Sequence, residues 1–418
     1  MTMVARYRKS VEQFTIMLQV IRTHKNLPVA AIVDFQLLIL KKVKEAEKAI
    51  SRTKELIQKL RLEKANDRPA RERVKEIKYL IKKLERKVER YRYIIYIWKM
   101  YVESIVFHFC DKYAVKHFLY DDKYNVKETA GYVSGKDGIK AEIALLKAAA
   151  KSNVPAVLCD LTNTLRHGDV CLLGSNDPYP IEVKTSKKLD RRGEKQLRSI
   201  GELSAFFTKD EAENFRGAGP VRRVEHIGTE RYHLSAINAC ISSSYEKGTS
   251  HLSPESGVHY LAITKFKKGA LDQISAMYAH VFNLNEYKTA MSWHPYTPFH
   301  LSLSPEHLFN FISGNLTIVV LLDLQIIKRR FKRCGMHIVF LQDENWYAQI
   351  SSTGNILDGG FRVSVQSFLR IVFEFQSLTW AIKQHKKHLS SFVEEKGNIG
   401  RAMEVPSDWI AAVDNIPT

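Results

Sequence analysis

RHGDV at residues 166–170 and IEVK at residues 181–184 are the two runs on which the fold of this chain is decided. Each belongs to a short apolar segment that also carries acidic residues. Residues two apart in a strand project on the same face, so we expect Glu182 and Lys184 to point together towards whatever Asp169 faces. Two carboxylates and an ammonium that converge at strand ends suit a divalent cation and a phosphate.

A regular order of elements surrounds the two runs. An Ala-rich amphipathic pattern predicts a helix over residues 139–150. Apolar runs predict strands at 154–159, 169–173, 180–185 and 221–227. Between the third and fourth strands, Asp190 can cap a helix that continues to residue 207. The predicted order is therefore helix, three strands, helix, strand.

The acidic residues in the strands are suited to phosphodiester hydrolysis. This reaction needs an activated water and neutralisation of the charge that develops on the phosphate and the leaving oxygen, and a hard divalent cation held by carboxylates supplies both. We expect Asp169 and Glu182 to be direct ligands, with the backbone carbonyl of Val183 as a third. Lys184 would orient or activate the water, or stabilise the developing charge. The expected cofactor is Mg²⁺ or Mn²⁺.

A basic cluster follows the third predicted strand directly. Lys187, Lys188, Arg191 and Arg192 lie at the start of the next predicted helix, whose backbone N–H groups add donors for phosphate. We expect substrate to bind here; the alternative is a solvated basic turn. His167 could also contact substrate, but a lone histidine is more often structural.

The pattern resembles the PD-(D/E)XK, or restriction-endonuclease-like, nuclease superfamily. The residues that carry the resemblance are Gly168-Asp169 and Glu182-Val183-Lys184, with Gly168 at the position of the name-giving proline. The predicted order of helices and strands agrees with the core of that superfamily. The resemblance covers roughly residues 131–230 and implies nothing about the rest of the chain.

Two further site residues are implied by this resemblance. Glu142, in the helix before the first strand, stands where many members carry another metal-site carboxylate. Gln196, in the helix after the motif, stands where several subfamilies carry a glutamine. The alternative to the whole assignment is that Glu182 and Lys184 form an exposed cross-strand pair and that Asp169 is a turn residue.

The N-terminal region is predicted to be an antiparallel helical coiled coil. Helices are expected over residues 2–24, 29–64 and from 70 onward, with a break at the sequence NDRP, residues 66–69. Apolar residues repeat every seven in the two longer helices. The repeating positions are Val43, Ile50 and Ile57 with Ala46, Thr53 and Leu60, then Val74, Ile81, Val88, Ile95, Val102 and Phe109 with Ile77, Leu84, Tyr91, Trp98 and Ile105.

This region also holds most of the positive charge. Residues 1–110 contain 26 Lys and Arg against 12 Asp and Glu, an excess of 14 out of the net +19 of the chain. Such an excess of one sign indicates attraction to a polyanion, nucleic acid or an anionic membrane. The alternatives are that the charges only solvate the helices, or that the arm contacts a protein partner or a second copy of itself.

Composition sets further limits. The chain has 418 residues, 45% hydrophobic and 26% charged, as in a soluble globular protein. Its five scattered cysteines, without a CxxC, argue against a disulfide framework or a structural zinc site and fit a reducing cytoplasm. No HExxH, no P-loop and no apolar run long enough to span a bilayer is present.

The C-terminal third is expected to be mixed α/β. Strands are predicted at 258–266, 274–284, 336–341 and 361–365, and helices at 231–246, 305–312, 318–333 and 366–387. The complete prediction is a mixed α+β protein in three parts. These are a basic coiled-coil arm at 1–118, a nuclease-like domain with an α-β-β-β-α-β core at 131–265, and an α/β accessory region at 266–418.

The function expected from these features is metal-dependent phosphodiester hydrolysis, by an endonuclease with DNA favoured over RNA as substrate. Cleavage of both DNA strands needs two active sites, so a homo-oligomer is expected, and analogy suggests bacterial, including antiviral, defence or restriction. One alternative is a non-catalytic nucleic-acid-binding or scaffold protein with a degenerate nuclease-like domain. Binding to a membrane surface is a third, disfavoured because the apolar helix faces are used in the heptad seam.

Overall fold

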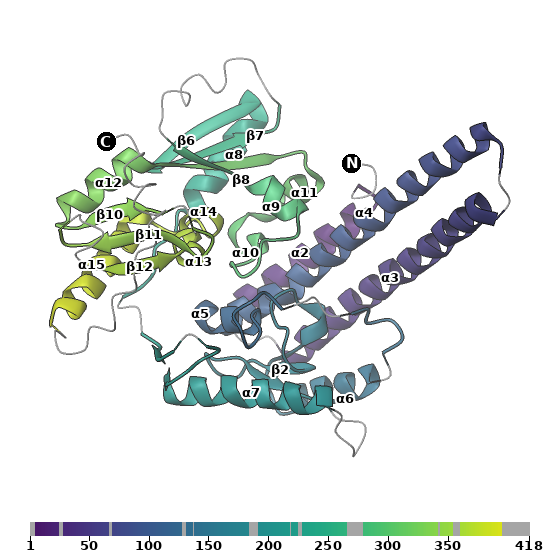
Figure 1. Cartoon of the computed structure of the whole chain (residues 1–418), viewed down its shortest axis with the longest axis horizontal. Coiled ribbons are helices and arrows are strands. Elements are labelled where there is room, and N and C mark those ends of the chain that lie inside the picture. Colours follow the sequence, from purple (N-terminus) through teal and green to yellow (C-terminus); the bar gives the residue numbers. More distant parts are fainter. Residues whose placement is uncertain are drawn as a thin grey trace. The chain divides into compact units, whose positions relative to one another are not determined.

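The computed structural model describes residues 5–24, 28–66, 69–127, 131–136, 138–183, 191–217, 219–224, 228–265, 279–341, 343–353 and 360–394. The chain divides into two compact units, Met1–Val224 and Glu225–Thr418, which are described separately. It is a mixed α+β protein with several small antiparallel sheets (Figure 1). Within the described ranges, no helix is both long and apolar enough to cross a membrane.

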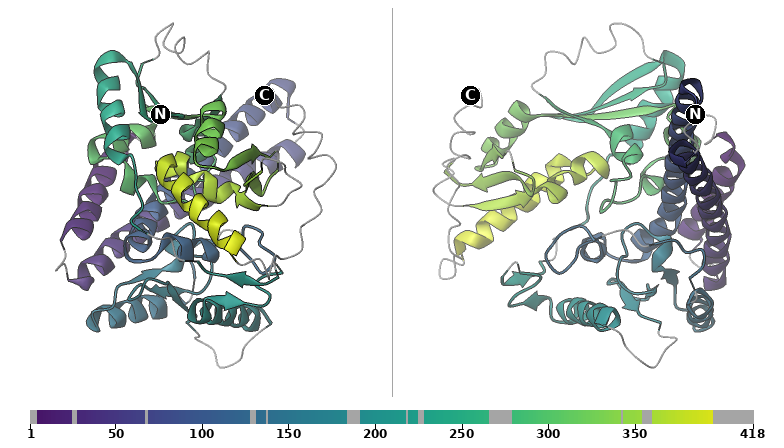
Figure 2. Two further views of the ribbon diagram at one scale, coloured as in Figure 1. Left: turned by 90° about the vertical axis from the view of Figure 1, so that its left-hand side faces the viewer. Right: turned by 45° about the vertical axis from the view of Figure 1, so that its right-hand side comes forward.

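Three helices open the first unit: α2 (Arg8–Thr23), α3 (Val29–Asn66) and α4 (Arg71–Phe109). Helices α3 and α4 run antiparallel, side by side (Figure 1, Figure 2). An apolar seam joins them, made of Ile50, Ile57 and Val88, with Ile81, Leu84, Tyr91 and Ile95 packed against it. All seven residues occupy predicted heptad positions. The predicted helical hairpin is therefore present.

The C-terminal half of α4 is buried on nearly all sides, unlike the half next to the hairpin tip. From Ile94 to Val106 almost every residue of α4 is buried, whereas the preceding turns expose one face. Phe14 of α2 packs edge-to-face against Phe35 of α3 and Trp98 of α4. Large aromatic rings in such contacts bury much apolar area. This end of the hairpin therefore forms part of the core of the first unit.

A three-stranded sheet follows the hairpin. Helix α6 (Ile139–Lys151) precedes strands β1 (Ala156–Leu158), β2 (Val170–Leu172) and β3 (Tyr179–Ile181), which pair antiparallel in the order β1-β2-β3. Helix α7 (Arg191–Lys209) comes next. Strands β4 (Glu211–Ala212) and β5 (Val221–Arg222) pair with each other. The order of helices and longer strands agrees with the prediction.

The predicted fourth strand differs from the expectation in two ways. It is only the two-residue strand β5, and residues 225–227 of the predicted strand lie outside the described residues. Strand β5 pairs with β4 in a separate two-stranded sheet and does not extend the sheet of β1 to β3. The predicted domain boundaries at 118–131 and 265 stay predictions; the first compact unit contains both the hairpin and the three-stranded sheet. Short one-turn helices α5 (Lys112–Val115), η1 (Lys116–Phe118) and η2 (Cys159–Leu161) complete the unit.

The second unit is built on two antiparallel sheets. The first has the order β6-β7-β9-β8, from β6 (Thr249–Glu255), β7 (Val258–Ile263), β8 (Ala279–Asn283) and β9 (Thr317–Asp323). The second joins β10 (His337–Phe340), β11 (Trp346–Ser351) and β12 (Phe361–Ser364). The helices are α8 (Leu234–Lys247), α9 (Leu284–Thr289), α10 (Phe299–Ser302), α11 (Pro305–Ser313), α12 (Leu324–Arg333), α13 (Val365–Phe368), α14 (Arg370–Phe373) and α15 (Leu378–Glu394).

Two predicted helices of this unit are wrong in part. The predicted helix over 318–333 begins as strand β9, and only α12 is helical. Strand β9 is central in its sheet and buried, and a continuous apolar run of that length does not distinguish a buried strand from a buried helix. The predicted helix over 366–387 is divided among α13, α14 and α15, with Phe375 at a left-handed φ of 55° between the last two.

Two strands of the second unit were not predicted. Strand β6 lies between a predicted helix and a predicted strand, and β11 carries polar residues among its apolar ones. Both strands form backbone hydrogen bonds with a neighbouring strand, β7 and β10 respectively. Their own sequences lack the regular alternation of apolar and polar residues that predicts a strand. Of the predicted strand at 274–284, the structure has β8 at its C-terminal end, and residues 274–278 lie outside the described residues.

Candidate functional site

Asp169 is fixed at one end of the three-stranded sheet, directly before the middle strand β2. Its N–H donates to the carbonyl of Ile181 over 2.8 Å, and its carbonyl accepts from the N–H of Cys159 over 2.9 Å. Its Oδ2 accepts a hydrogen bond of 2.9 Å from the N–H of Val183. These bonds tie Asp169 to the ends of both neighbouring strands. Its carboxylate is therefore held in one orientation.

At this end of the sheet, three carboxylates form ion pairs with one ammonium group. Lys136 Nζ lies 2.8 Å from Glu142 Oε1, 2.9 Å from Asp160 Oδ2 and 2.9 Å from Asp169 Oδ1. Glu142 comes from the first turn of α6, Asp160 from η2 after β1, and Asp169 from the start of β2. The fold thus brings Glu142 and Asp169, two of the predicted site residues, to a common cation.

The electrostatics of this cluster follow from its burial. Glu142 has a side chain only 2% exposed, and its Oε2 accepts no hydrogen bond from any described residue. Burial raises the pKa of Glu142, opposed by Lys136 and reinforced by the nearby Asp169 and Asp160. Burial alone would lower the pKa of Lys136, but the three carboxylates outweigh it and raise that pKa. Lys136 is therefore a charged ammonium at any physiological pH.

The loop that carries Lys136 is anchored by the helical hairpin. Glu47 of α3 is 2% exposed, and its two carboxylate oxygens accept from the N–H groups of Val133, at 3.0 Å, and Ser134, at 2.7 Å. Gln36 lies eleven residues before Glu47 in α3. Its side-chain amide accepts a hydrogen bond from the N–H of Leu158 in β1 and donates one to the carbonyl of Ala156. The hairpin is therefore part of the scaffold of the site.

Glu182 lies opposite Asp169 if the register of β2 and β3 is continued by one residue, since Val170 pairs with Ile181. Directly opposed residues share a face of the sheet, as the sequence predicted. Glu182 is half-buried and lies near the ammonium of Lys127; it makes no ion pair with Lys136. Val183 approaches Asp169 with its N–H, so its carbonyl as a ligand stays a prediction.

The other predicted residues fall into two groups. Gln196 is half-buried on α7, three residues before Ser199, so both share one face of the helix. Gln196 makes no hydrogen bond with a described residue. Arg191 and Arg192 begin α7, but their side chains are outside the described parts. Lys184, Lys187 and Lys188 lie wholly outside the described residues.

His167 is structural. One ring nitrogen lies 3.0 Å from the carbonyl of Tyr120, and the other lies 3.3 Å from Ser199 Oγ. Burial, more than any neighbouring charge, lowers the pKa of His167 to about 4, so the ring is neutral at pH 7. The side chain therefore links the start of β2 to α7 and to the loop after η1.

Lys136 and Asp160 were missed by reasoning from the sequence. Asp160 lies two residues after β1, and Asp169 directly precedes β2, so the position of Asp160 near a strand end was a usable signal. Lys136 stands in a Gly-rich turn, SGKDG, where nothing in the local pattern marks it. Its role depends on contacts with residues up to 33 positions away in the chain.

The donor set of the cluster suits a hard divalent cation, because carboxylate oxygens are the ligands that Mg²⁺ and Mn²⁺ prefer. As they stand, the described residues contain no group of three Asp, Glu, His or Cys side chains placed to hold a metal ion. Lys136 separates the three carboxylates at this point. The chain matches no protein-family model, no curated protein and no solved structure.

Proposed function

We propose that this chain is a metal-dependent nuclease that hydrolyses phosphodiester bonds, with DNA as the preferred substrate. The observation that carries the proposal is the meeting of Glu142 and Asp169 on the ammonium of Lys136 at the start of β2. Asp169 is held rigidly there by its neighbours, as a preorganised ligand should be. The antiparallel register adds Glu182 to the same face.

The residues that would hold the divalent cation are Asp169, Glu142 and Glu182, with Asp160 and the Val183 carbonyl as further oxygen donors. The ion would supply charge neutralisation and an activated water. Asp169 would contribute a fixed carboxylate, and Lys184 would contribute a charge next to the reacting phosphate. The basic residues Lys187, Lys188, Arg191 and Arg192 would position the phosphate backbone.

The helical hairpin offers a surface for nucleic acid. Tyr79, Lys82, Lys83, Arg86 and Arg90 line a shallow groove on α4. They recur at three- and four-residue spacing, so they lie on one face of the helix. The four cations form no ion pair within the described residues, although Arg61, Arg73 and Arg92 do. A stripe of one sign with an exposed tyrosine suits a phosphate backbone.

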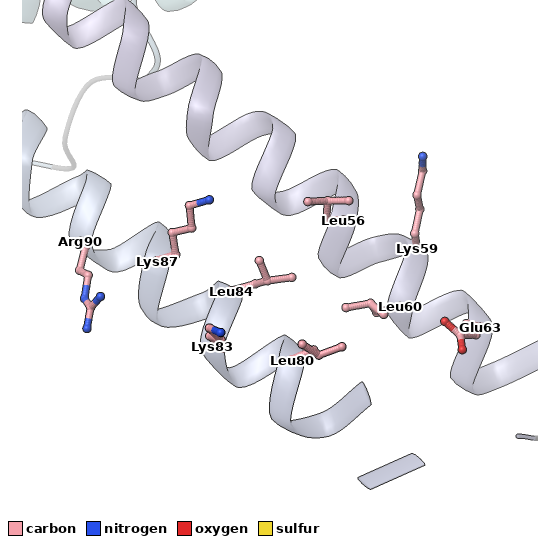
Figure 3. Close-up of a pocket in the computed structure, with 9 residues that line it drawn as sticks. All are labelled: Leu56, Lys59, Leu60, Glu63, Leu80, Lys83, Leu84, Lys87 and Arg90. Carbon is pink, nitrogen blue, oxygen red and sulfur yellow. The ribbon is translucent and has the colours of Figure 1, made fainter. Parts of the chain in front are cut away.

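A second basic groove lies between α3 and α4. Figure 3 shows Leu60 of α3 pointing towards Leu80 and Leu84 of α4 across the space between the helices, whereas Lys59 and Arg90 point away from these leucines. The basic residues that line it are Lys59, Lys83, Lys87 and Arg90. We propose that α3 and α4 form a coiled coil that presents these charges to DNA and that also provides contacts between two copies of the chain.

The test is a cleavage assay on three substrates: plasmid DNA, single-stranded DNA and RNA. Each is incubated with the full chain, with and without MgCl₂ or MnCl₂, beside the variants Asp169→Asn and Lys184→Ala and the exposed control Lys140→Ala. The asparagine keeps an oxygen to accept from the Val183 N–H but loses the charge. We expect metal-dependent cleavage by the wild type and the control, and loss of cleavage in both site variants.

Cleavage that persists in both site variants would remove the assignment of the site. Absence of cleavage on every substrate would favour the second candidate, a non-catalytic nucleic-acid-binding protein. One observation favours that candidate: among the described residues, the three carboxylates already share the cation of Lys136, and no metal-ligating group is assembled. It predicts binding that is independent of metal and falls steeply with salt.

The biological setting stays an analogy. A nuclease joined to a basic helical arm, without a P-loop in its sequence, resembles effectors of bacterial restriction and defence. Double-strand cleavage by such a chain requires two copies. Sedimentation of the purified chain with and without DNA tests that requirement.

A further inference from the structure

Lys136 sits where the proposed nuclease would bind its divalent cation. An ammonium group has three N–H donors, and each carboxylate lies at hydrogen-bonding distance: Glu142 at 2.8 Å, Asp160 at 2.9 Å and Asp169 at 2.9 Å. Oxygens from three different elements surround one positive charge. This arrangement has the form of a metal site with an amine in the position of the ion.

The cluster retains features that an ammonium does not satisfy. Glu142 Oε2 is buried and accepts no hydrogen bond from the described residues, and such an oxygen is costly to bury. One ammonium balances only one of the three carboxylate charges, whereas a divalent cation in its place would balance two. Lys99, buried on α4, is a second cation near Asp160, but it makes no ion pair with a described residue.

We propose that Lys136 is a resident counter-ion that a divalent cation displaces, so that metal binding and the three ion pairs of Lys136 exclude each other. The inference rests on the proposed function for the location of the metal. Mg²⁺ takes oxygen ligands at about 2.1 Å, closer than the 2.8 and 2.9 Å held by Lys136. The carboxylates can close on the ion only after the ammonium has left.

The backbone around Lys136 allows this exchange without unfolding the loop. Glu47 holds Val133 and Ser134, the two residues just before the turn, and Gly135 adopts a φ of 85° that a glycine takes without strain. The Lys136 side chain is already 32% exposed. Rotation about its own four-carbon stem moves the ammonium into water, while the loop stays anchored to α3.

Metal titration of a charge-removed variant tests this exchange. The full chain, freed of metal, is titrated with MnCl₂ by isothermal calorimetry as wild type, as Lys136→Met and as Lys140→Met, an exposed lysine on α6. Methionine fills similar volume without charge. We expect Lys136→Met to bind Mn²⁺ at least tenfold more tightly than wild type, and Lys140→Met to match wild type. Equal or weaker binding by folded Lys136→Met would overturn the proposal.

A second measurement uses the wild-type chain alone and so does not depend on the folding of a variant. Lysine acylation by an N-hydroxysuccinimide ester is read by mass spectrometry, with and without MgCl₂. Ion-paired Lys136 should be protected, and we expect its labelling to rise several-fold with Mg²⁺ while that of Lys140 stays constant. Labelling of Lys136 that does not change with Mg²⁺ would contradict displacement.

The outcomes separate this inference from the nuclease proposal. Tighter Mn²⁺ binding by Lys136→Met in a chain that cleaves no nucleic acid would support the exchange and remove the nuclease assignment. Metal-dependent cleavage that requires Asp169, together with unchanged Mn²⁺ affinity in Lys136→Met, would support the nuclease and remove the exchange. Absence of Mn²⁺ binding by any variant would contradict both.

Discussion

Asp169 shows how much of the site is built by backbone hydrogen bonds. Its N–H and C=O bond to Ile181 and Cys159, and its two carboxylate oxygens bond to the N–H of Val183 and to Lys136. Every polar group of this residue has a partner. In the proposed metal site, a carboxylate held in this way would need little reorganisation to bind a cation.

Glu103 provides a test of the buried scaffold behind the site. It lies on α4, 3% exposed, and accepts hydrogen bonds from Thr164 and Asn163 in the loop between β1 and β2. Burial is the largest influence and raises its pKa to about 7, against those hydrogen bonds. Between pH 4.5, the ordinary pKa of a glutamate, and about pH 7, Glu103 is therefore protonated in the folded state and ionised in the unfolded state.

We expect Glu103→Gln to change how stability depends on pH. In the wild type, stability should fall as pH rises from about 4.5 to about 7, by roughly 3 kcal/mol, because only the unfolded state is ionised there. The glutamine does not titrate, so this slope should disappear. Urea unfolding followed by circular dichroism at pH 5, 6, 7 and 8 measures the slope. Parallel profiles for the two proteins would contradict the buried, protonated state of Glu103.

The residues of the site differ in how far sequence can place them. Asp169 and Glu182 follow from strand alternation and from register, because directly paired residues share a face. Lys136 and Asp160 join them through a contact that depends on how α6, η2 and β2 meet in space. No local period encodes that meeting, so sequence alone could not place the ammonium among the carboxylates.

At the scale of elements, the α3 and α4 hairpin has two roles. Its lower half packs aromatic residues into the core and holds the site through Gln36 and Glu47. The half next to its tip exposes Lys82, Lys83, Arg86 and Arg90, which form no ion pair with a described residue. Cations four apart on one helix repel each other by a few tenths of a kcal/mol per pair, a cost that a bound polyanion would remove.

We expect the triple variant Lys82→Gln, Arg86→Gln, Arg90→Gln to bind duplex DNA at least tenfold more weakly. The dependence of log K on log salt should become shallower by about 2 to 3, because up to three phosphate contacts are lost. Stability should stay equal or rise slightly, since repulsion at i, i+4 spacing is removed. Fluorescence anisotropy at several salt concentrations measures both quantities.

The matched control for this variant removes the same charge from another helix. Lys140, Lys147 and Lys151 of α6 are exposed and can be changed to glutamine together. If the control weakens DNA binding as much as the α4 variant does, net charge rather than the stripe on α4 is responsible. If neither changes binding, the hairpin does not contact DNA.

In the second unit, Glu255 at the end of β6 holds three elements together. It accepts from His233, Arg330 and the first backbone N–H groups of α15, at Leu378 and Thr379. Burial alone would raise its pKa, but the hydrogen bonds from His233 and Thr379 and the charge of Arg330 lower it to about 2. A carboxylate at a helix N-terminus is also favoured by the helix dipole.

We expect Glu255→Gln to destabilise the second unit by about 2 kcal/mol at pH 7. The carboxylate's contribution is fully present above its unfolded pKa of 4.5 and is lost as pH falls towards 2. The difference between wild type and variant should therefore shrink below pH 4.5. Hydrogen exchange of α15 amides at pH 7 and thermal unfolding from pH 3 to 7 measure it. An equal difference at pH 3 and pH 7 would contradict the assignment.

The elements divide into those that sequence could predict and those it could not. The heptads of α3 and α4 repeat over many turns, so their seam was correctly placed. Strand β9 was predicted as the start of a helix because its continuous apolar run does not distinguish a buried strand from a buried helix, and its place in the middle of a sheet cannot be read from the sequence. Strand β5 was expected beside the other strands, but it pairs locally with β4.

On the scale of the whole molecule, charge and chemistry are separated along the chain. Fourteen of the nineteen net positive charges belong to residues 1–110, whereas the acidic cluster is at residues 136–169. Both lie in the first compact unit. We therefore expect substitutions in the hairpin stripe to alter the proposed DNA binding, and substitutions at Asp169 to alter the proposed metal binding, independently of each other.

The nuclease proposal depends on Asp169 binding the divalent cation that supports DNA hydrolysis. The most direct measurement is the rate of nicking of closed circular DNA in MgCl₂ by the wild type and by Asp169→Asn, after circular dichroism shows that both are folded. We expect nicking that stops when the metal is chelated and is at least 100-fold slower in Asp169→Asn. Equal rates in the two proteins, or nicking that continues without metal, would contradict it.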